Sequence, residues 1–359
     1  MTDPDHDLKA KAKRRLSQHR PRSPRETLGA LANHAALACD ADLYGAGGAV
    51  NLLESRTADL LGKPAAMFFI KGMIAQMSVL RAVADSAGAA NIVVHPMSHI
   101  DFDEEDALWR LHNLHPIRIG RYAPFTAKQL DAITDPIAAV VVELPLRRSG
   151  YLLPAIEELG AISSWCRERA IHLHLDGARL WEAAAGYGIG PEELAGLADS
   201  VYVSFYKGLG GLGGAVVAGE ASFVHSLAVW KTRHGGNLYT AYPYAISDLD
   251  GLDRYLPRMG IYVERARDLA RLLNKIPKLA LTPATPDVNA FHLLLPGSVD
   301  ALSARHRDFA REREIWLFNG FLESPVEGHC VAEVVIGDSS DDYELPEAAS
   351  WISDFLDRS

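Results

Sequence analysis

The chain has 359 residues, of which 48% are hydrophobic and 23% charged, with a formal net charge of −10. This composition is typical of a globular protein with a large core and disfavours a disordered or low-complexity chain. No run of about 18 uncharged apolar residues is present, which disfavours a membrane-spanning helix. The length allows about two domains.

The charge is unevenly distributed along the chain. Residues Lys9–Arg25 carry eight Lys or Arg side chains and no Asp or Glu, so the remainder is strongly acidic. An acidic body argues against a nucleic-acid partner. Because Pro21 and Pro24 interrupt the basic stretch, we expect residues 1–30 to form a basic N-terminal arm that is mobile or loosely docked.

Three cysteines, Cys39, Cys166 and Cys330, lie far apart. Their spacing matches neither a disulfide framework nor a metal site, and it fits a reducing cytoplasm. We therefore expect a cytoplasmic protein without a structural metal.

Beyond the arm, strand-like and helix-like segments alternate. In chain order the pattern predicts a strand at Ala65–Ile70, a helix at Gly72–Ala87, strands at Asn91–His95 and Ala138–Leu144, a helix at Pro154–Arg169, a strand at Ile171–Leu175, a short helix from Pro191, and strands at Ser200–Phe205 and Gly214–Gly219. This alternation indicates an α/β fold with a mostly parallel sheet sandwiched by helices.

The last third of the chain has a different pattern. A helical stretch at Tyr255–Leu273 is expected to lead into a second unit with strands near Ala290–Leu295 and Cys330–Ile336 and a closing helix near Ala348–Leu356. We therefore predict a large domain of residues 31–250 and a small α+β C-terminal domain of residues 251–359.

Ligands of open α/β sheets bind at the carboxyl ends of the strands, so the residues that follow each predicted strand are informative. Three stand out there: His99, Asp176 and Lys207. Lys207 lies between an apolar strand and the glycine-rich turn Gly208–Gly214. A lysine in a dry pocket has a lowered pKa and can form a Schiff base, whereas at the surface it would simply cap the strand. Asp176 favours the first interpretation, because a carboxylate is the recognised partner of the pyridine nitrogen in pyridoxal phosphate enzymes.

Other polar residues nearby are open to two interpretations. Arg179 follows Asp176 within one helical turn, so both could face one ligand, or Asp176 could cap a helix with Arg179 as its neutralising neighbour. His99 lies among acidic residues and is equally well explained as a loop histidine. His172 and His174 form a His-x-His pattern without a third ligand at suitable spacing, which favours a packed pair over a metal site.

A competing motif is present in the turn after Lys207. Gly208–Gly213 satisfies G-x-G-x-x-G, but a strand rather than a helix follows, and Thr232 and Arg233 stand where an acidic residue is expected. These departures argue against a nicotinamide-dependent oxidoreductase. The glycines more simply let the backbone pass close to a ligand held at Lys207.

Two segments carry a resemblance to a known family. Leu173–Trp181 contains His-Leu-Asp-Gly-Ala-Arg-Leu, and Asp199–Gly219 contains Lys-Gly-Leu-Gly. Both resemble the corresponding segments of the threonine aldolase and β-eliminating lyase family, which has the fold type I architecture of the aspartate aminotransferase superfamily. Asp42–Glu54 and Val141–Glu143 are similar to further segments of that family. The resemblance implies pyridoxal 5′-phosphate as cofactor and a homodimer or homotetramer.

The resemblance also implies roles for individual residues. Lys207 would hold the cofactor, Asp176 would keep its pyridine nitrogen protonated, and His99 would stack on its ring. Arg179 would bind the phenolic oxygen of the cofactor or the carboxylate of the substrate. The family's Ser-Gly-Thr phosphate turn is here replaced by Lys71, Gly72 and Met73, and Ser204 completes the expected cofactor contacts.

Several departures concern the substrate. The family's serine before the catalytic lysine is here Tyr206, an arginine of its Gly-Gly-Gly-Met-Arg segment is Tyr239, and Val331–Asp338 contains no arginine that could bind a carboxylate. Arg147 and Arg148 are candidates to replace this clamp. The expected activity is cleavage of a β-hydroxy-α-amino acid to glycine and an aldehyde, with Lys207, His99 and Asp176 as catalytic residues. Alternatives are β-elimination, transamination or racemisation with the same cofactor, or a protein that binds the cofactor but has lost catalysis.

Overall fold

The computed structural model describes residues 5–277 and 279–357, and the chain divides into two compact units. The large unit consists of residues 22–258. The small unit combines the segment up to Pro21 with the chain from Met259 onward. The division after residue 258 lies beyond the boundary expected near residue 250.

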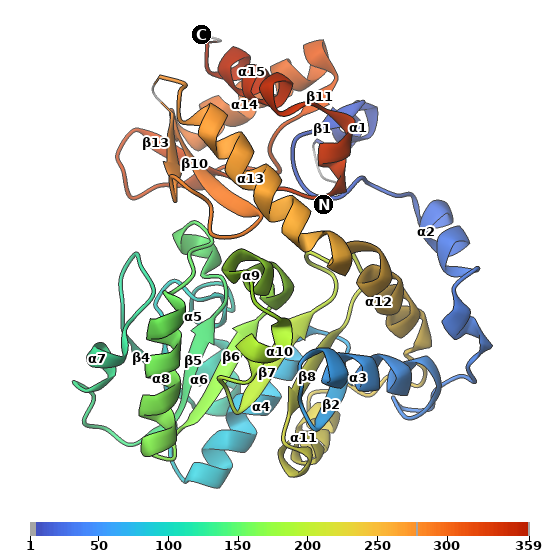
Figure 1. Cartoon of the computed structure of the whole chain (residues 1–359), viewed down its shortest axis with the longest axis vertical. Helices are drawn as coiled ribbons and strands as arrows, with labels where there is room; N and C mark the ends of the chain where they lie inside the picture. Colours follow the sequence, from blue (N-terminus) through green and yellow to red (C-terminus); the bar gives the residue numbers. More distant parts are fainter. Residues whose placement is uncertain (1–4, 278, 358–359) are drawn as a thin grey trace. The chain divides into compact units, whose positions relative to one another are not determined.

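The large unit is built on a seven-stranded sheet with the order β2-β8-β7-β6-β5-β3-β4 (Figure 1). All neighbouring pairs are parallel except those of β8, which runs antiparallel to both β2 and β7. The turn Phe205–Gly214 between β7 and β8 contains no helix, so β8 turns back beside β7 instead of crossing over. The strands are β2 (Ala65–Phe69), β3 (Asn91–Val94), β4 (His115–Arg118), β5 (Ile137–Glu143), β6 (His172–Gly177), β7 (Ser200–Ser204) and β8 (Ala215–Gly219).

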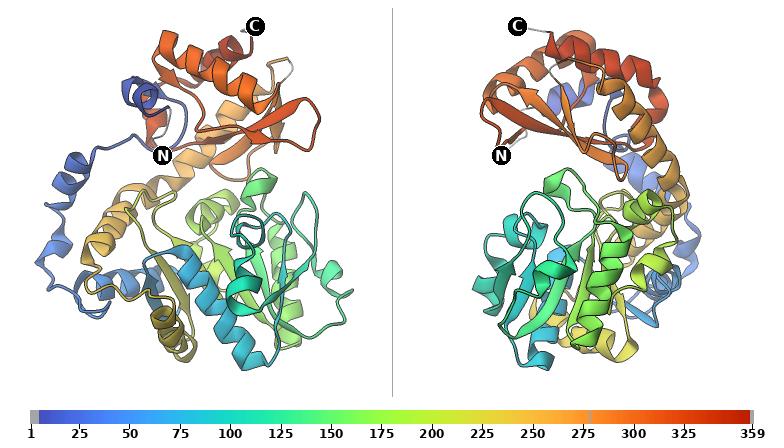
Figure 2. Two further views of the ribbon diagram at one scale, coloured as in Figure 1. Left: turned by 180° about the vertical axis from the view of Figure 1, so that it is seen from behind. Right: turned by 60° about the vertical axis from the view of Figure 1, so that its left-hand side comes forward.

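Helices cover both faces of this sheet (Figures 1 and 2). On one face α4 and α11 pack together over an apolar cluster that includes Met77, Val141 and Val217. Because side chains alternate along a strand, Val142 points to the other face, where Ile162 of α8 lies near it. The helices of this unit are α2 (Pro24–Leu31), η1 (Ala35–Ala38), α3 (Gly48–Leu60), α4 (Gly72–Ala87), α5 (His99–Phe102), α6 (Ala107–His112), α7 (Ala127–Leu130), η2 (Arg147–Ser149), α8 (Ile156–Glu168), α9 (Leu180–Tyr187), α10 (Pro191–Ala195), α11 (Ala221–Arg233) and α12 (Tyr242–Tyr255).

The local sequence explains where the helix under the site starts and stops. Helix α4 begins at Gly72, directly after β2, and ends before Gly88, which adopts a left-handed φ of 62°. Glycine is the residue that reaches this conformation at least cost and so commonly ends helices. These bounds confirm the predicted helix.

The small unit contains a four-stranded antiparallel sheet with the order β12-β13-β10-β9. Its sheet strands are β9 (Ala280–Thr282), β10 (Ala290–Pro296), β12 (Leu322–Glu323) and β13 (His329–Val335), and its helices are α1 (His6–Lys11), α13 (Met259–Leu273), α14 (Val299–Arg313), η4 (Asp338–Asp342) and α15 (Leu345–Leu356). The predicted strands and closing helix of this region are therefore present. The predicted helical stretch from Tyr255 to Leu273 is present, but it is divided: α12 ends at Tyr255, and η3 (Leu256–Arg258) precedes α13. Pro257 in that turn lacks the N–H that a continuous helix needs.

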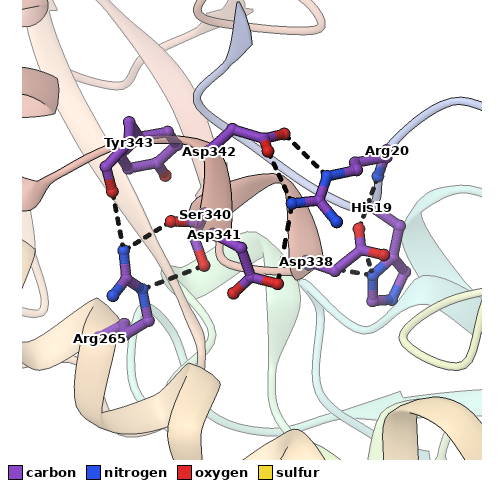
Figure 3. A network of polar contacts seen from close by, with 8 residues as sticks. All are labelled: His19, Arg20, Arg265, Asp338, Ser340, Asp341, Asp342 and Tyr343. Carbon is purple, nitrogen blue, oxygen red and sulfur yellow. Dashed lines mark hydrogen bonds and ion pairs between the residues drawn. The ribbon is translucent and has the colours of Figure 1, made fainter.

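The basic N-terminal segment forms part of the small unit and is not a loose arm. Strand β1 (Arg14–Arg15) pairs in parallel with β11 (Ile315–Trp316). The Arg20 guanidinium donates to both carboxylate oxygens of Asp342, at 2.8 and 2.7 Å, and its backbone N–H donates to Asp338 at 2.7 Å (Figure 3). The expectation of a mobile arm is corrected by this docking, in which carboxylates of η4 neutralise the basic side chain. Residues 1–4 of the predicted arm lie outside the described residues.

The η4 turn, which binds the Arg20 segment, also binds an arginine of helix α13. Arg265 of α13 donates to the hydroxyl and the carbonyl oxygen of Ser340 and to the carbonyl oxygen of Tyr343 (Figure 3). Two arginines from distant parts of the chain therefore order one acidic turn. Within the described residues, no helix is both long and apolar enough to cross a bilayer.

Candidate active site

The site residues lie at the carboxyl edge of the large sheet. Asp176 is the fifth residue of β6, and its register partners are Glu143 on β5 and Tyr202 on β7. Lys207 follows β7 in the turn toward β8, and His99 opens α5 shortly after β3. The rule that ligands bind at strand ends thus brings together residues from four segments of the chain.

Lys207 is a half-buried amine among charges of both signs. Burial and the positive charge of Arg179 lower its pKa to about 8, against the attraction of the carboxylates of Asp176 and Glu143. A fraction of such an amine is neutral near neutral pH, and the neutral form is the nucleophile. The lysine has the chemistry expected for Schiff-base formation and is not a surface cap.

Asp176 and Glu143 form a pair of buried carboxyl groups, with exposed fractions of 2% and 8%. Burial raises the pKa of both groups, and for Glu143 the charge of Asp176 adds to the effect and brings the pKa to about 7. Lys207 opposes the rise at Asp176. Two adjacent carboxyl groups in a dry site cannot both ionise freely, so one tends to keep its proton.

Glu143 also links two loops of the site. One of its oxygens accepts the backbone N–H of His99 at 2.5 Å and the other accepts the N–H of Arg147 at 3.1 Å. It therefore ties the start of α5 to the start of η2. The side chain of His99 in turn places Nδ1 at 3.1 Å from Glu104 Oε1. Burial and the charge of Lys207 lower the pKa of His99 to about 4, so its ring is neutral at neutral pH.

The three candidate arginines differ in their surroundings. Arg179 precedes α9, with its guanidinium carbon 5.2 Å from the centre of the Tyr151 ring. The charges of Arg179 and Arg147 both lower the pKa of Lys207. Arg148 donates to Asp103 at 3.0 Å and lies 4.1 Å from the Phe102 ring centre. Arg148 is therefore held by Asp103 and by the Phe102 ring.

The start of α4 is shaped by two tyrosines. A Cβ atom on Gly72 would overlap the hydroxyl oxygen of Tyr202 and lie 3.1 Å from that of Tyr206. Only glycine allows both hydroxyls to approach the start of this helix, where backbone N–H groups favour an anion. The Nζ of Lys71 lies 5.2 Å from the Tyr206 ring centre. Met73 follows in the first turn, and the buried Ser204 lies on the same face of β7 as Tyr202.

Sequence reasoning did not single out Glu143, Tyr202 or Gln76. Glu143 could have been found, because it ends an apolar strand as Asp176 nearly does. Gln76 lies on the inner face of α4, with its Oε1 2.7 Å from His174 Nε2, and its side chain lowers the pKa of the Asp176 carboxyl group. Nothing in the local sequence separates such a glutamine from one at the surface. Across residues 5–277 and 279–357, no three His, Cys, Asp or Glu side chains are grouped to hold a metal ion.

The sequence matches the beta-eliminating lyase family over residues 25–294. The chain belongs to this family. Threonine aldolases are among the proteins similar to this chain. A low-specificity L-threonine aldolase of Candida albicans is 30% identical over 234 residues, which is 60% of each chain. A low-specificity L-threonine aldolase of Arabidopsis thaliana is 24% identical over 78% of this chain and 81% of its own.

Two crystal structures support the family over nearly the whole length. One, from Listeria monocytogenes EGD-E, is described as a candidate L-allo-threonine aldolase; it is 34% identical with a TM-score of 0.91 and covers 98% of each chain. The other, from Exiguobacterium sp. 255-15, is described as a candidate aromatic amino acid beta-eliminating lyase/threonine aldolase; it is 34% identical with a TM-score of 0.90 over 97% of this chain and 99% of its own. These matches confirm the predicted family and the fold type I class.

Proposed function

We propose that this protein is a pyridoxal 5′-phosphate-dependent lyase that cleaves a β-hydroxy-α-amino acid between Cα and Cβ, giving glycine and an aldehyde. The observation that carries the proposal is the half-buried Lys207 of lowered pKa beside the buried carboxyl of Asp176. The threonine aldolase relatives support the same reaction.

The residues present fit this cofactor. Lys207 supplies the amine that would hold it, and Asp176 supplies a buried carboxylate for the pyridine nitrogen. The start of α4, with Lys71, Gly72 and Met73, presents backbone N–H groups and one positive charge to a phosphate. Ser204, His99 and Arg179 are proposed as further contacts. When bound, pyridoxal phosphate supplies an electron sink for the pair released at Cα.

The chain's own residues would orient the substrate and move its proton. Arg147 and Arg179 are proposed to bind the substrate carboxylate, since guanidinium groups match carboxylates in geometry and charge. His99 is neutral, and its Nδ1–H points to Glu104, so Nε2 is left as an acceptor. We propose that this nitrogen takes the proton of the substrate β-hydroxyl.

The decisive experiment is the absorbance spectrum of the purified protein before and after borohydride. We expect the wild type to be yellow and to keep a covalently reduced adduct on Lys207, located by mass spectrometry, whereas Lys207→Ala should retain none. Lys63→Ala is the matched control, because the Lys63 amine donates to the carbonyl of Ala198 and is not among the site residues. An adduct that persists in Lys207→Ala would refute the proposal.

Product analysis then separates the reactions. Release of glycine and an aldehyde from β-hydroxy amino acids supports the lyase. Transfer of the amino group to a keto acid would identify a transaminase instead, and cofactor binding without either reaction would identify a protein that has lost catalysis.

We also propose a homodimer or homotetramer in the cytoplasm. Four neighbouring apolar side chains, Leu43, Tyr44, Tyr239 and Tyr242, are 56, 62, 66 and 37% exposed, and a patch of this kind usually marks an interface. Tyr44 and Tyr239 contact each other edge to face at 5.5 Å, so the patch is ordered. The three cysteines are unpaired, which supports a reducing compartment. A monomer in light scattering would contradict the assembly.

A further inference from the structure

A polar stripe crosses the otherwise apolar face of the sheet that α4 covers. On β6 His172, His174 and Asp176 alternate with leucines, so they share one face. Ser200 of β7 is the register partner of His174 on that face. His174 and Ser200 have no exposed surface. Burying such groups is costly unless each finds a hydrogen-bonding partner.

The partners form one continuous chain. His172 Nε2 lies 2.7 Å from Ser200 Oγ, and the same oxygen lies 2.7 Å from His174 Nδ1. His174 Nε2 lies 2.7 Å from Gln76 Oε1, and the Gln76 side chain in turn lies close enough to Asp176 to lower the pKa of its carboxyl group. Five side chains thus run from the far edge of the sheet to the carboxylate of the candidate site.

If Asp176 is ionised, every hydrogen bond in this series must donate in one direction, toward Asp176. An ionised carboxylate accepts hydrogen bonds and donates none, so Gln76 must turn its NH₂ group to Asp176 and its oxygen to His174. His174 then donates through Nε2–H, and its unprotonated Nδ1 accepts the hydroxyl proton of Ser200. The hydroxyl oxygen of Ser200 in turn accepts from His172 Nε2–H.

The opposite polarity has a different consequence. If His174 carried its proton on Nδ1, its Nε2 would need a donor, and Gln76 would have to turn its NH₂ group to the histidine. The Gln76 oxygen would then face Asp176, which is tolerable only if Asp176 is protonated. The tautomer of His174 therefore reports the charge of Asp176. A doubly protonated His174 is disfavoured, because burial lowers its pKa to about 3.

We propose that His172, Ser200, His174 and Gln76 are positioning residues whose hydrogen bonds all donate toward Asp176 and keep it ionised for the cofactor ring nitrogen. The role at the cofactor rests on the proposed function, whereas the polarity of the chain does not. The outer end is accessible from the opposite edge of the sheet, since His172 and Asp199 line a groove of about 970 Å³ together with Arg167 and Arg233.

The polarity is tested by NMR on the full-length protein labelled with ¹⁵N-histidine and freed of cofactor. We expect His174 to be neutral with its proton on Nε2 throughout the neutral range. Gln76→Leu removes the acceptor of that proton and should release the tautomer into a mixture. Ser163→Ala is the matched control, because the buried Ser163 hydroxyl donates to the carbonyl oxygen of Leu197 and takes no part in this series of hydrogen bonds. His174 protonated on Nδ1 or on both nitrogens would overturn the proposal.

The effect on the cofactor is tested by titrating pyridoxal phosphate into the same proteins. Gln76→Leu should raise the dissociation constant at least tenfold, because the amide that favours the ionised form of Asp176 is lost. Ser200→Ala, which leaves Gln76 and His174 in place, should raise it by a smaller factor, and Ser163→Ala should leave it unchanged. An unchanged constant in Gln76→Leu would overturn the positioning role. If the wild type bound no cofactor, the proposed function and the positioning role would both fail, and the tautomer would still decide the polarity.

Discussion

Replacing Gly72 by alanine should disturb the start of α4 through a single atom. The added Cβ would overlap the hydroxyl oxygen of Tyr202 and lie 2.9 Å from its Cζ. Tyr202 is only 3% exposed, so its ring has no solvent to move into. The clash must be absorbed by shifting the helix start or the tyrosine.

The size of the effect follows from two opposing contributions. Overpacking a dense core costs about 1–3 kcal/mol. Alanine in place of glycine returns up to about 1 kcal/mol of helix propensity. With the full return, the net loss is up to about 2 kcal/mol, which lowers the melting temperature by up to roughly 8 °C for a unit of this size. The dissociation constant for pyridoxal phosphate should rise as well, because the displaced N–H groups face the proposed phosphate site.

Calorimetry and cofactor titration on three further proteins make the prediction sharp. Gly160→Ala in α8 is the control, because its Cβ meets no atom within 4 Å and should stabilise by about 0.5–1 kcal/mol. Tyr202→Phe in the Gly72→Ala background removes the overlapping oxygen and should restore part of the loss, whereas Tyr202→Phe alone should not stabilise. If Gly72→Ala were as stable as Gly160→Ala, the close approach of Tyr202 to the helix would be refuted.

Three other predictions concern charge. Folding raises the pKa of Glu143 to about 7, so its protonated carboxyl contributes stability at pH values below the pKa of the unfolded chain, and this contribution is lost as the pH rises through 7. Glu143→Gln, which cannot titrate, should therefore flatten the decline of the urea midpoint between pH 5 and 8. Burial lowers the pKa of His306 to about 4, so stability should fall as the pH drops from about 6.5 toward 4, and His306→Gln, which cannot titrate, should lose less; an equal loss would contradict this. Arg147→Ala should raise KM for the amino acid about tenfold or more, whereas Arg148→Ala, which breaks the pair with Asp103, should raise it less; the reverse order in steady-state kinetics would exclude the proposed clamp.

The sequence predicts those parts of the fold and site that depend on local patterns. Helix α4 is predicted at its observed bounds because glycine stands at both ends, and Lys207 and Asp176 are found because each lies at the end of an apolar strand. His99 and Arg179 are also found from their positions near strand ends, and family resemblance adds the roles proposed for them.

The parts that sequence reasoning missed depend on long-range register. Gln76 reaches Asp176 only because α4 packs across β6, and nothing near residue 76 signals this contact. The sequence did not show that Arg148 is paired with Asp103, 45 residues away, or that Arg147 lowers the pKa of Lys207. The basic segment looked like a loose arm because the carboxylates of η4 that hold it lie at the other end of the sequence.

The pairing of β1 with β11 has a consequence for how the chain is made. The two strands are separated by about 300 residues, so at roughly 5–20 residues per second β1 emerges from the ribosome some 15–60 s before its partner. During that time the large unit can fold, while the cationic segment waits without its acidic partners. We expect nascent chains halted before residue 315 to be cut readily by trypsin within Lys9–Arg20, and the finished protein to resist cleavage there.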